Sequence, residues 1–254
     1  MKNRTLEEIL ADETHGATTL FIESLDYFLC LDDKNFVTRI TEESEKLQKH
    51  FTAMGLFQRL HVDVLKMQEK GKIISQLQNL KGQILQNTQN LVSDGANVFP
   101  RAAKILTISY SSLVRDVIVT ARKNEKNPHV FCLRSAPKNE GELLCQNLES
   151  VRVSCQLIED DFAKNSPENI DLILLGCDMF SDNFFINKTG SAELVKSVSE
   201  NNIPVWILGD SLRYVSGFSE KFPTIFEKID YENNCSILSE FGLTSVADFL
   251  KFAK

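Results

Sequence analysis

The sequence Lys104-Ile105-Leu106-Thr107-Ile108-Ser109-Tyr110-Ser111-Ser112-Leu113 decides the fold class of this chain. It begins with a short, mostly apolar run that is typical of a buried strand, and the hydroxyl residues after it lead into a helical pattern. Similar runs recur at 129–133, 151–158, 171–175 and 204–208, with helical stretches near 111–123, 139–149 and 189–201 between them. Strands that alternate with helices predict an α/β fold, a Rossmann-like doubly wound parallel sheet over residues 100–254.

Upstream of this region, residues 1–99 carry the periodicity of helices. Apolar side chains recur one, three and four positions apart, which places them on one face of a helix. We therefore expect a separate N-terminal helical domain, built as a bundle of packed hairpins. The apolar stripes are Phe21, Ile22, Leu25, Phe28 and Leu29; Leu47, Phe51 and Met54; and Ile73, Ile74, Leu77, Leu80, Ile84 and Leu91.

Composition and charge limit the classes of function. The 254-residue chain has a net charge of −7 and no lysine–arginine cluster dense enough to neutralise a phosphate backbone, so we expect no nucleic-acid partner. The charged N-terminus lacks the apolar core of a signal peptide, and no apolar run approaches the roughly 20 residues that span a bilayer. We therefore expect a cytoplasmic protein with no membrane partner.

The six cysteines, at positions 30, 132, 145, 155, 177 and 235, form no CxxC pair. Several lie within or beside apolar runs, where a thiol behaves as a small hydrophobic group. We expect all six to be buried reduced thiols, and hence a reducing compartment. The four histidines form no arrangement typical of a metal site or a catalytic triad, so we expect neither a metal nor a cofactor.

Ligands of parallel α/β sheets bind at the carboxyl ends of the strands, so the residues after each run are the candidates for a site. Ser109-Tyr110-Ser111-Ser112 suits a helix cap and also an anion site, since both use the free amides of a helix N-terminus. Arg134, after the second run, either belongs to an ordinary strand-to-helix loop or holds a phosphate or carboxylate. Both pairs of interpretations remain open at this point.

The fourth run ends in Gly176-Cys177-Asp178. Lys188 comes later in the chain, just before Gly190 and Ser191. An acid at the end of a buried strand is poorly solvated, which raises its pKa and suits it to proton transfer. Lys188 and the helix start after it are able to hold an anion. The alternative is an aspartate that caps a turn beside a solvated lysine. After the fifth run, Asp210 or Ser211 is expected to cap the following helix.

These strand ends, in this order, resemble the translation initiation factor 2B alpha/beta/delta regulatory subunit family. That family is related to the methylthioribose-1-phosphate and ribose-1,5-bisphosphate isomerases. The resemblance covers about residues 100–250, and the helical half agrees only in type. The matching segments are Ile105 to Val114 with "ILTH-x-x-S-x-x-V", Pro137 to Gly141 with "RP-x-x-EG", Gly176-Cys177-Asp178 with "GAD", Ile186 to Ser191 with "NKIGT", Ile203-Pro204-Val205 with "GIPV", and Ser236 to Leu243 with "TDLGVLTP".

The resemblance implies a pocket for a phosphorylated sugar or a nucleotide. In the isomerases a cysteine and an aspartate move protons; Asp178 matches the aspartate, whereas Ser109 stands where the cysteine is expected. Glu140, Asn187 and Lys188 match positions that hold the substrate. The arginine of the isomerase loop falls on Ala136, and Arg134 is a candidate to replace its charge. A hydroxyl ionises far less readily than a thiol, so Ser109 is a poor proton carrier.

Three functions are therefore considered, of which the first is preferred and the third is left unranked. The first is a regulatory phosphometabolite-binding protein with a degenerate isomerase site, because Asp178, Asn187 and Lys188 are retained without the thiol. The second is a divergent isomerase that converts an aldose 1-phosphate to a ketose phosphate, with Ser109 or the neighbouring Cys177 in place of the missing thiol. The third is an exchange-factor subunit that acts by protein contacts alone. The resemblance also implies a homodimer, or a hetero-oligomer with related subunits.

Overall fold

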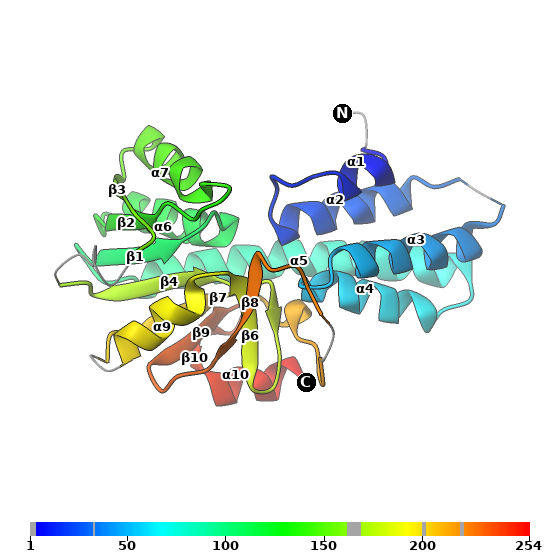
Figure 1. Cartoon of the computed structure of the whole chain (residues 1–254). Coiled ribbons are helices and arrows are strands. Elements are labelled where there is room, and N and C mark those ends of the chain that lie inside the picture. Colours follow the sequence, from blue (N-terminus) through cyan, green and yellow to red (C-terminus); the bar gives the residue numbers. More distant parts are fainter. Residues whose placement is uncertain (1–3, 33, 162–168, 200–201, 219–220) are drawn as a thin grey trace.

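The computed structural model of the protein describes residues 4–32, 34–161, 169–199, 202–218 and 221–254. Its N-terminal part is helical, as predicted, and its C-terminal part is built around a mostly parallel sheet (Figure 1). The N-terminal helices are α1 (Leu6–Leu10), α2 (Ala17–Leu29), α3 (Phe36–His50), α4 (Gly55–Leu65) and the long α5 (Lys70–Val98).

One predicted helical stripe, Leu47-Phe51-Met54, is wrong, because α3 ends at His50 and the chain turns before α4 begins. Where α4 begins, Gly55 makes a contact with a distant part of the chain. The Gly55 amide donates to the Asp178 carbonyl oxygen at 2.9 Å, and a Cβ atom at Gly55 would lie 2.1 Å from the Arg213 carbonyl oxygen. This close approach requires glycine and fixes the turn against the sheet.

The long helix α5 belongs to two hydrophobic cores. Its first half, from Ile73 to Ile84, packs with α1–α4, whereas Leu91 and Ala96 pack with the sheet. Figure 1 shows α5 extending from the helical part to the sheet. Helix α5 thereby connects the helical part to the sheet through packing at both of its ends.

The main sheet has seven strands in the order β10-β9-β7-β4-β1-β2-β3. All neighbours are parallel except β10, which is antiparallel to β9. Helices α5, α6 and α7 cover one face, and α9 and α10 cover the other, which confirms the doubly wound fold. The strands are β1 (Lys104–Ile108), β2 (His129–Leu133), β3 (Ser154–Ile158), β4 (Leu172–Gly176), β7 (Val205–Leu208), β9 (Cys235–Ser239) and β10 (Gly242–Ser245). The helices are α6 (Ser112–Lys123), α7 (Glu140–Ser150), α9 (Ser191–Ser199), α10 (Val246–Ala253) and the 3-10 helix η1 (Ser211–Arg213).

A second, three-stranded antiparallel sheet was not predicted. It contains β5 (Met179–Phe180), β6 (Phe184–Lys188) and β8 (Phe226–Asp230) in that order. No strand was predicted for the segment before Lys188. This segment is a strand, because β8, some forty residues later, supplies its hydrogen-bonding partner. The predicted helix 189–201 corresponds to α9, and residues 200–201 lie outside the described residues.

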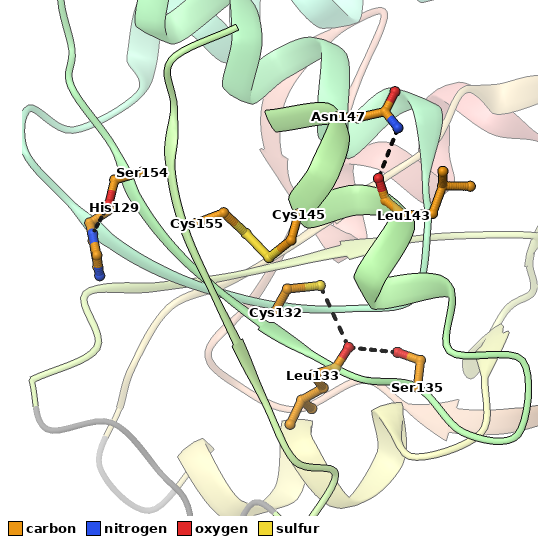
Figure 2. The surroundings of a disulfide bond; sticks show 9 residues. All are labelled: His129, Cys132, Leu133, Ser135, Leu143, Cys145, Asn147, Ser154 and Cys155. Atoms are coloured by element: carbon orange, nitrogen blue, oxygen red, sulfur yellow. Dashed lines mark hydrogen bonds between the residues drawn. A yellow bond between two sulfur atoms is a disulfide. The ribbon is translucent and has the colours of Figure 1, made fainter. Parts of the chain in front are cut away.

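The prediction of six reduced thiols is also wrong, because Cys145 and Cys155 form a disulfide (Figure 2). The two cysteines are ten residues apart, a spacing that matches no pairing motif. The chain turns back between α7 and β3, which brings the Cα atoms of Cys145 and Cys155 to 5.4 Å. The cysteines outside a disulfide are Cys30, Cys132, Cys177 and Cys235, of which Cys30 is exposed. The reducing compartment that we inferred from the thiols therefore loses that support. No helix among the described residues is long and apolar enough to cross a membrane.

Candidate functional site

The order of strands places the candidate residues at one point of the sheet. From β1 the chain moves outward to β2 and β3, whereas from β4 it moves in the opposite direction to β7 and β9. The carboxyl ends of β1 and β4 therefore flank the topological switch point, where α/β proteins bind ligands. Ser109 follows β1, and Asp178 follows β4.

A cavity of about 340 Å³ lies at this switch point, between the strand ends and the helical part. It contains five of the six predicted site residues: Ser109, Glu140, Asp178, Asn187 and Lys188. The helical part closes it with the α1–α2 loop (residues 12–16), the start of α2, and His50, Phe51 and Met54. The site is therefore shared between the two parts of the chain.

A chain of polar contacts joins three of these residues. The Ser109 hydroxyl donates to Glu140 Oε2 at 3.3 Å, and Lys188 Nζ forms an ion pair with the same oxygen at 2.6 Å. The Lys188 side chain is 6% exposed, yet its Nζ makes no well-oriented hydrogen bond within the described residues. Because a buried ammonium group needs acceptors, Lys188 is suited to hold an anionic or hydroxyl-bearing ligand.

Asp178 lies beside these residues on the loop between β4 and β5. Burial raises the pKa of its carboxyl group to about 6 against the lowering effect of the Arg213 guanidinium. Glu140 raises this pKa further and Lys188 lowers it. A carboxyl group with this pKa is partly protonated near neutral pH, so it is able both to donate and to accept a proton.

Asn187 and Lys188 owe their positions to β6. Asn187 is buried and donates to the Ser191 hydroxyl at 2.9 Å, at the start of α9. The next residue in the strand, Lys188, points to Glu140. The antiparallel pairing of β6 with β8 thus fixes two neighbouring side chains at the cavity.

Sequence reasoning missed Arg213, which connects three parts of the site. Its guanidinium donates from Nε to Asp210 Oδ2 at 3.1 Å, from Nη1 to the Cys177 carbonyl oxygen at 3.0 Å, and from Nη2 to Thr18 Oγ1 at 2.5 Å. Asp210 also caps η1, as predicted. In the sequence, Asp210 and Arg213 follow the end of a predicted buried strand with Asp-x-x-Arg spacing. This spacing by itself indicates only a capped turn.

Two helix N-termini face the cavity. Ser111 caps α6 by accepting from the Val114 amide at 3.4 Å, and residues 109–113 line the cavity, so both roles considered for this segment are compatible. α2 begins after Gly16, which offers no side-chain cap, and Ala17 and Thr18 line the opposite wall. The free amides and positive dipole ends of both helices favour a negatively charged group in the space between them.

The α1–α2 loop was also missed, because we treated the helical half as a packing element. Asp12 accepts from the amides of Thr14 and His15 at 2.7 and 2.9 Å, and its other oxygen contacts His15 Nδ1 at 2.7 Å. Burial opposes ionisation of Asp12, but these hydrogen bonds hold its pKa well below the usual range. Lys138 Nζ forms an ion pair with Glu13 at 3.0 Å, which connects this loop to the β2–α7 loop. His15 is thereby held at the cavity wall by a charged carboxylate.

Arg134 lies elsewhere. Its guanidinium contacts Glu142 on α7 and Glu159 after β3, and it is not among the residues that line the cavity. Cys177 does line the cavity, but burial raises the pKa of its thiol well above the ordinary value, so it supplies little thiolate. No group of three or more metal-binding side chains occurs in the described parts of the chain.

Comparison with known proteins gives relatives of two kinds. The chain is 20% identical, over 92% of its length and 87% of the relative, to a putative translation initiation factor eIF-2B subunit 2-like protein of Pyrococcus furiosus. It is 25% identical to the ribose 1,5-bisphosphate isomerase of Methanocaldococcus jannaschii, over 57% of this chain and 47% of the isomerase.

Solved structures agree on the fold. A translation initiation factor eIF-2B structure from Pyrococcus horikoshii superimposes with a TM-score of 0.82 at 22% identity, over 96% of this chain and 97% of that one. A chain of the tetrameric eIF2B-beta2-delta2 complex of C. thermophilum gives a TM-score of 0.74 at 11% identity, over 99% and 96%. The model of the Initiation factor 2 subunit family matches residues 23–233. Since this match covers more than half of the chain, the protein belongs to the Initiation factor 2 subunit family.

Proposed function

We propose that this protein binds a phosphorylated sugar or nucleotide at the switch-point cavity and acts as a regulatory member of its family, with a degenerate isomerase site. One observation carries the proposal: the N-termini of α2 and α6 and the buried amine of Lys188 line one cavity. Helix N-termini suit a phosphate, and Glu140, Asn187 and Asp178 supply polar groups for sugar hydroxyls. Ser109 replaces the thiol expected for isomerisation, which favours binding without turnover.

The proposal is tested by thermal shift and calorimetric titration with ribose 5-phosphate, ribose 1-phosphate, AMP and inorganic phosphate, with neutral ribose as the control ligand. A ligand that binds only the folded protein raises its melting temperature. We expect a shift that Lys188→Met abolishes and that Lys196→Met, an exposed lysine on α9, leaves unchanged. Because Lys188→Met leaves Glu140 unpaired, the double variant with Glu140→Gln serves as the stability control. Absence of binding by every phosphorylated compound at millimolar concentration refutes the proposal.

The alternative is a divergent isomerase acting on an aldose 1-phosphate. The raised pKa of Asp178 favours it, because a carboxyl group with a pKa of about 6 exchanges protons readily near neutral pH. NMR detection of the ketose product from each compound that binds distinguishes the two functions. Turnover that disappears in Asp178→Asn, with binding retained, would replace the regulatory proposal by the enzymatic one.

We also propose that the protein forms a homodimer or assembles with related subunits. The support is the tetrameric assembly named for a structural neighbour, together with the exposed side chains of Phe241, Leu243 and Phe252 near the β10 edge. Size-exclusion chromatography with light scattering tests this proposal, and a monomer at all concentrations contradicts self-association. A cytoplasmic location stays a prediction, which fractionation of the source cells would test.

A further inference from the structure

The Cys145–Cys155 disulfide joins two elements that both lead to the cavity. Cys145 lies on α7 and is buried, whereas Cys155 is half-buried on β3, the last strand of the main sheet. Because β3 has a neighbour on one side only, its backbone position depends on β2 and on α7. The disulfide therefore joins α7 covalently to the edge strand β3, which pairs with β2 along its length (Figure 2).

On one side, α7 begins with the carboxylate that pairs with the cavity lysine. Glu140, the first residue of α7, contacts Lys188 and Ser109. Cys145 lies five residues later in the same helix, so any movement of Cys145 with the helix moves Glu140 as well. Gly141, directly after Glu140, packs closely against the end of β2, because a Cβ atom there would lie 1.9 Å from the Leu133 carbonyl oxygen.

On the other side, the end of β3 is connected to Ser109. Asp160, two residues after β3, accepts from the amides of Ser135 and Ala136 at 2.6 and 2.7 Å. The Ser135 hydroxyl in turn accepts from the Ser109 amide at 2.6 Å. A displacement of β3 is therefore transmitted through Asp160 and Ser135 to the strand end that forms the cavity wall.

A third thiol beside the disulfide does not compete with it. Figure 2 shows Cys132 next to the Cys145–Cys155 bond, with its Sγ directed to the Leu133 carbonyl oxygen at 3.6 Å. Burial raises the pKa of the Cys132 thiol to about 12, and the charge of Asp160 adds to this effect. Since the thiolate is the attacking species, the neutral Cys132 thiol exchanges slowly with the disulfide, and rapid reduction of the disulfide requires an external thiol.

We propose that the Cys145–Cys155 pair is a reversible redox switch that holds Glu140 and Ser109 in place at the cavity when oxidised and releases them when reduced. In reduction, a dithiol attacks Cys155, expels Cys145 as a thiolate that takes up a proton, and closes its own disulfide with release of the Cys155 thiol. In oxidation, glutathione disulfide accepts the two electrons and leaves as two glutathione molecules. The consequence for ligand affinity rests on the proposed function; the change in the cavity wall does not.

Hydrogen–deuterium exchange of the oxidised protein and of the protein treated with dithiothreitol tests the switch. We expect amides of residues 140–150 and 109–112 to exchange about tenfold faster after reduction, since the cross-link no longer limits local opening. The reference segment is α9, on the opposite face of the sheet, which is expected to keep its rate. Unchanged exchange in α7, or a change that does not reach residues 109–112, overturns the proposal.

Variants separate the disulfide from other effects of the reductant. Cys145→Ser and Cys155→Ser should each show the exchange of the reduced protein, with no response to dithiothreitol. Cys30→Ser, which removes an exposed cysteine outside the disulfide, should respond as the native protein does. Return of the native pattern with glutathione disulfide is required for a reversible switch, and failure to return refutes it.

Titration with ribose 5-phosphate in both redox states completes the experiment. Weaker binding after reduction supports the switch, and equal binding in the two states overturns its coupling to the ligand site. If neither state binds, the proposed function fails, and hydrogen exchange alone decides whether the switch exists.

Discussion

Replacing Asp178 by asparagine should stabilise the protein at neutral pH. Burial raises the pKa of this carboxyl group from 3.8 to about 6, so the folded protein disfavours its charged form. At a pH between 3.8 and about 6, Asp178 of the folded protein holds a proton that the same residue of the unfolded chain has already released. Rising pH therefore favours unfolding, and the penalty is complete above a pH of about 7. Asparagine is neutral at every pH and avoids this penalty.

The magnitude follows from the shift. About two pKa units at 1.36 kcal/mol each amount to about 3 kcal/mol, which is an upper limit because the carboxyl group opens onto a cavity that water can enter. We expect Asp178→Asn to unfold with the same free energy as the native protein near pH 4. Above pH 7 the variant should be more stable by up to about 3 kcal/mol.

Urea unfolding of the native protein and of Asp178→Asn at five pH values from 4 to 8 measures the difference in their free energies of unfolding. Groups that titrate alike in both proteins cancel in this difference. Asp182→Asn is the matched control. Hydrogen bonds from Lys254 and Tyr214 lower the pKa of Asp182, so this variant should be less stable than the native protein at pH 7, and the difference should shrink as the pH falls. A difference for Asp178→Asn that does not change with pH, or that has the opposite sign, refutes the reasoning.

Three further changes test the fold around the site. Arg213→Met leaves Asp210 buried without its ion pair and should lower the free energy of unfolding, measured in urea, by about 3–5 kcal/mol. The double variant Arg213→Met with Asp210→Asn should recover part of this loss, because no buried charge is left unpaired. Gly141→Ala forces a methyl group against the Leu133 carbonyl and should cost about 1–3 kcal/mol by thermal unfolding, so an unchanged melting temperature would contradict the close approach. Thr5→Ala removes the capping box of α1 and should cost about 1 kcal/mol; Thr5→Ser should retain most of the stability.

Periodicity alone determined the α/β class and the positions of most strands, because alternation between short apolar runs and helical stripes is a local property of the chain. It also pointed to Ser109, Arg134, Asp178 and Lys188, because ligands of parallel sheets bind where the strands end, whereas Glu140 and Asn187 were predicted only from the family resemblance. Local reasoning was sufficient for Ser109 and Asp178, which follow β1 and β4, whereas Lys188 lies in β6, a strand that the periodicity did not indicate.

Tertiary structure alone decided the remaining features, each of which depends on contacts between different elements of the fold. Thr18 and Arg213 are 195 residues apart, and no pattern in either segment indicates their contact. The pairing of β6 with β8 and the Cys145–Cys155 disulfide likewise depend on how the chain turns back on itself. Arg134 was predicted to bind a ligand and does not line the cavity. Its guanidinium instead forms ion pairs with Glu142 and Glu159, which the fold places beside it. Sequence therefore determines which side chains reach the strand ends, and packing determines which of them face the cavity.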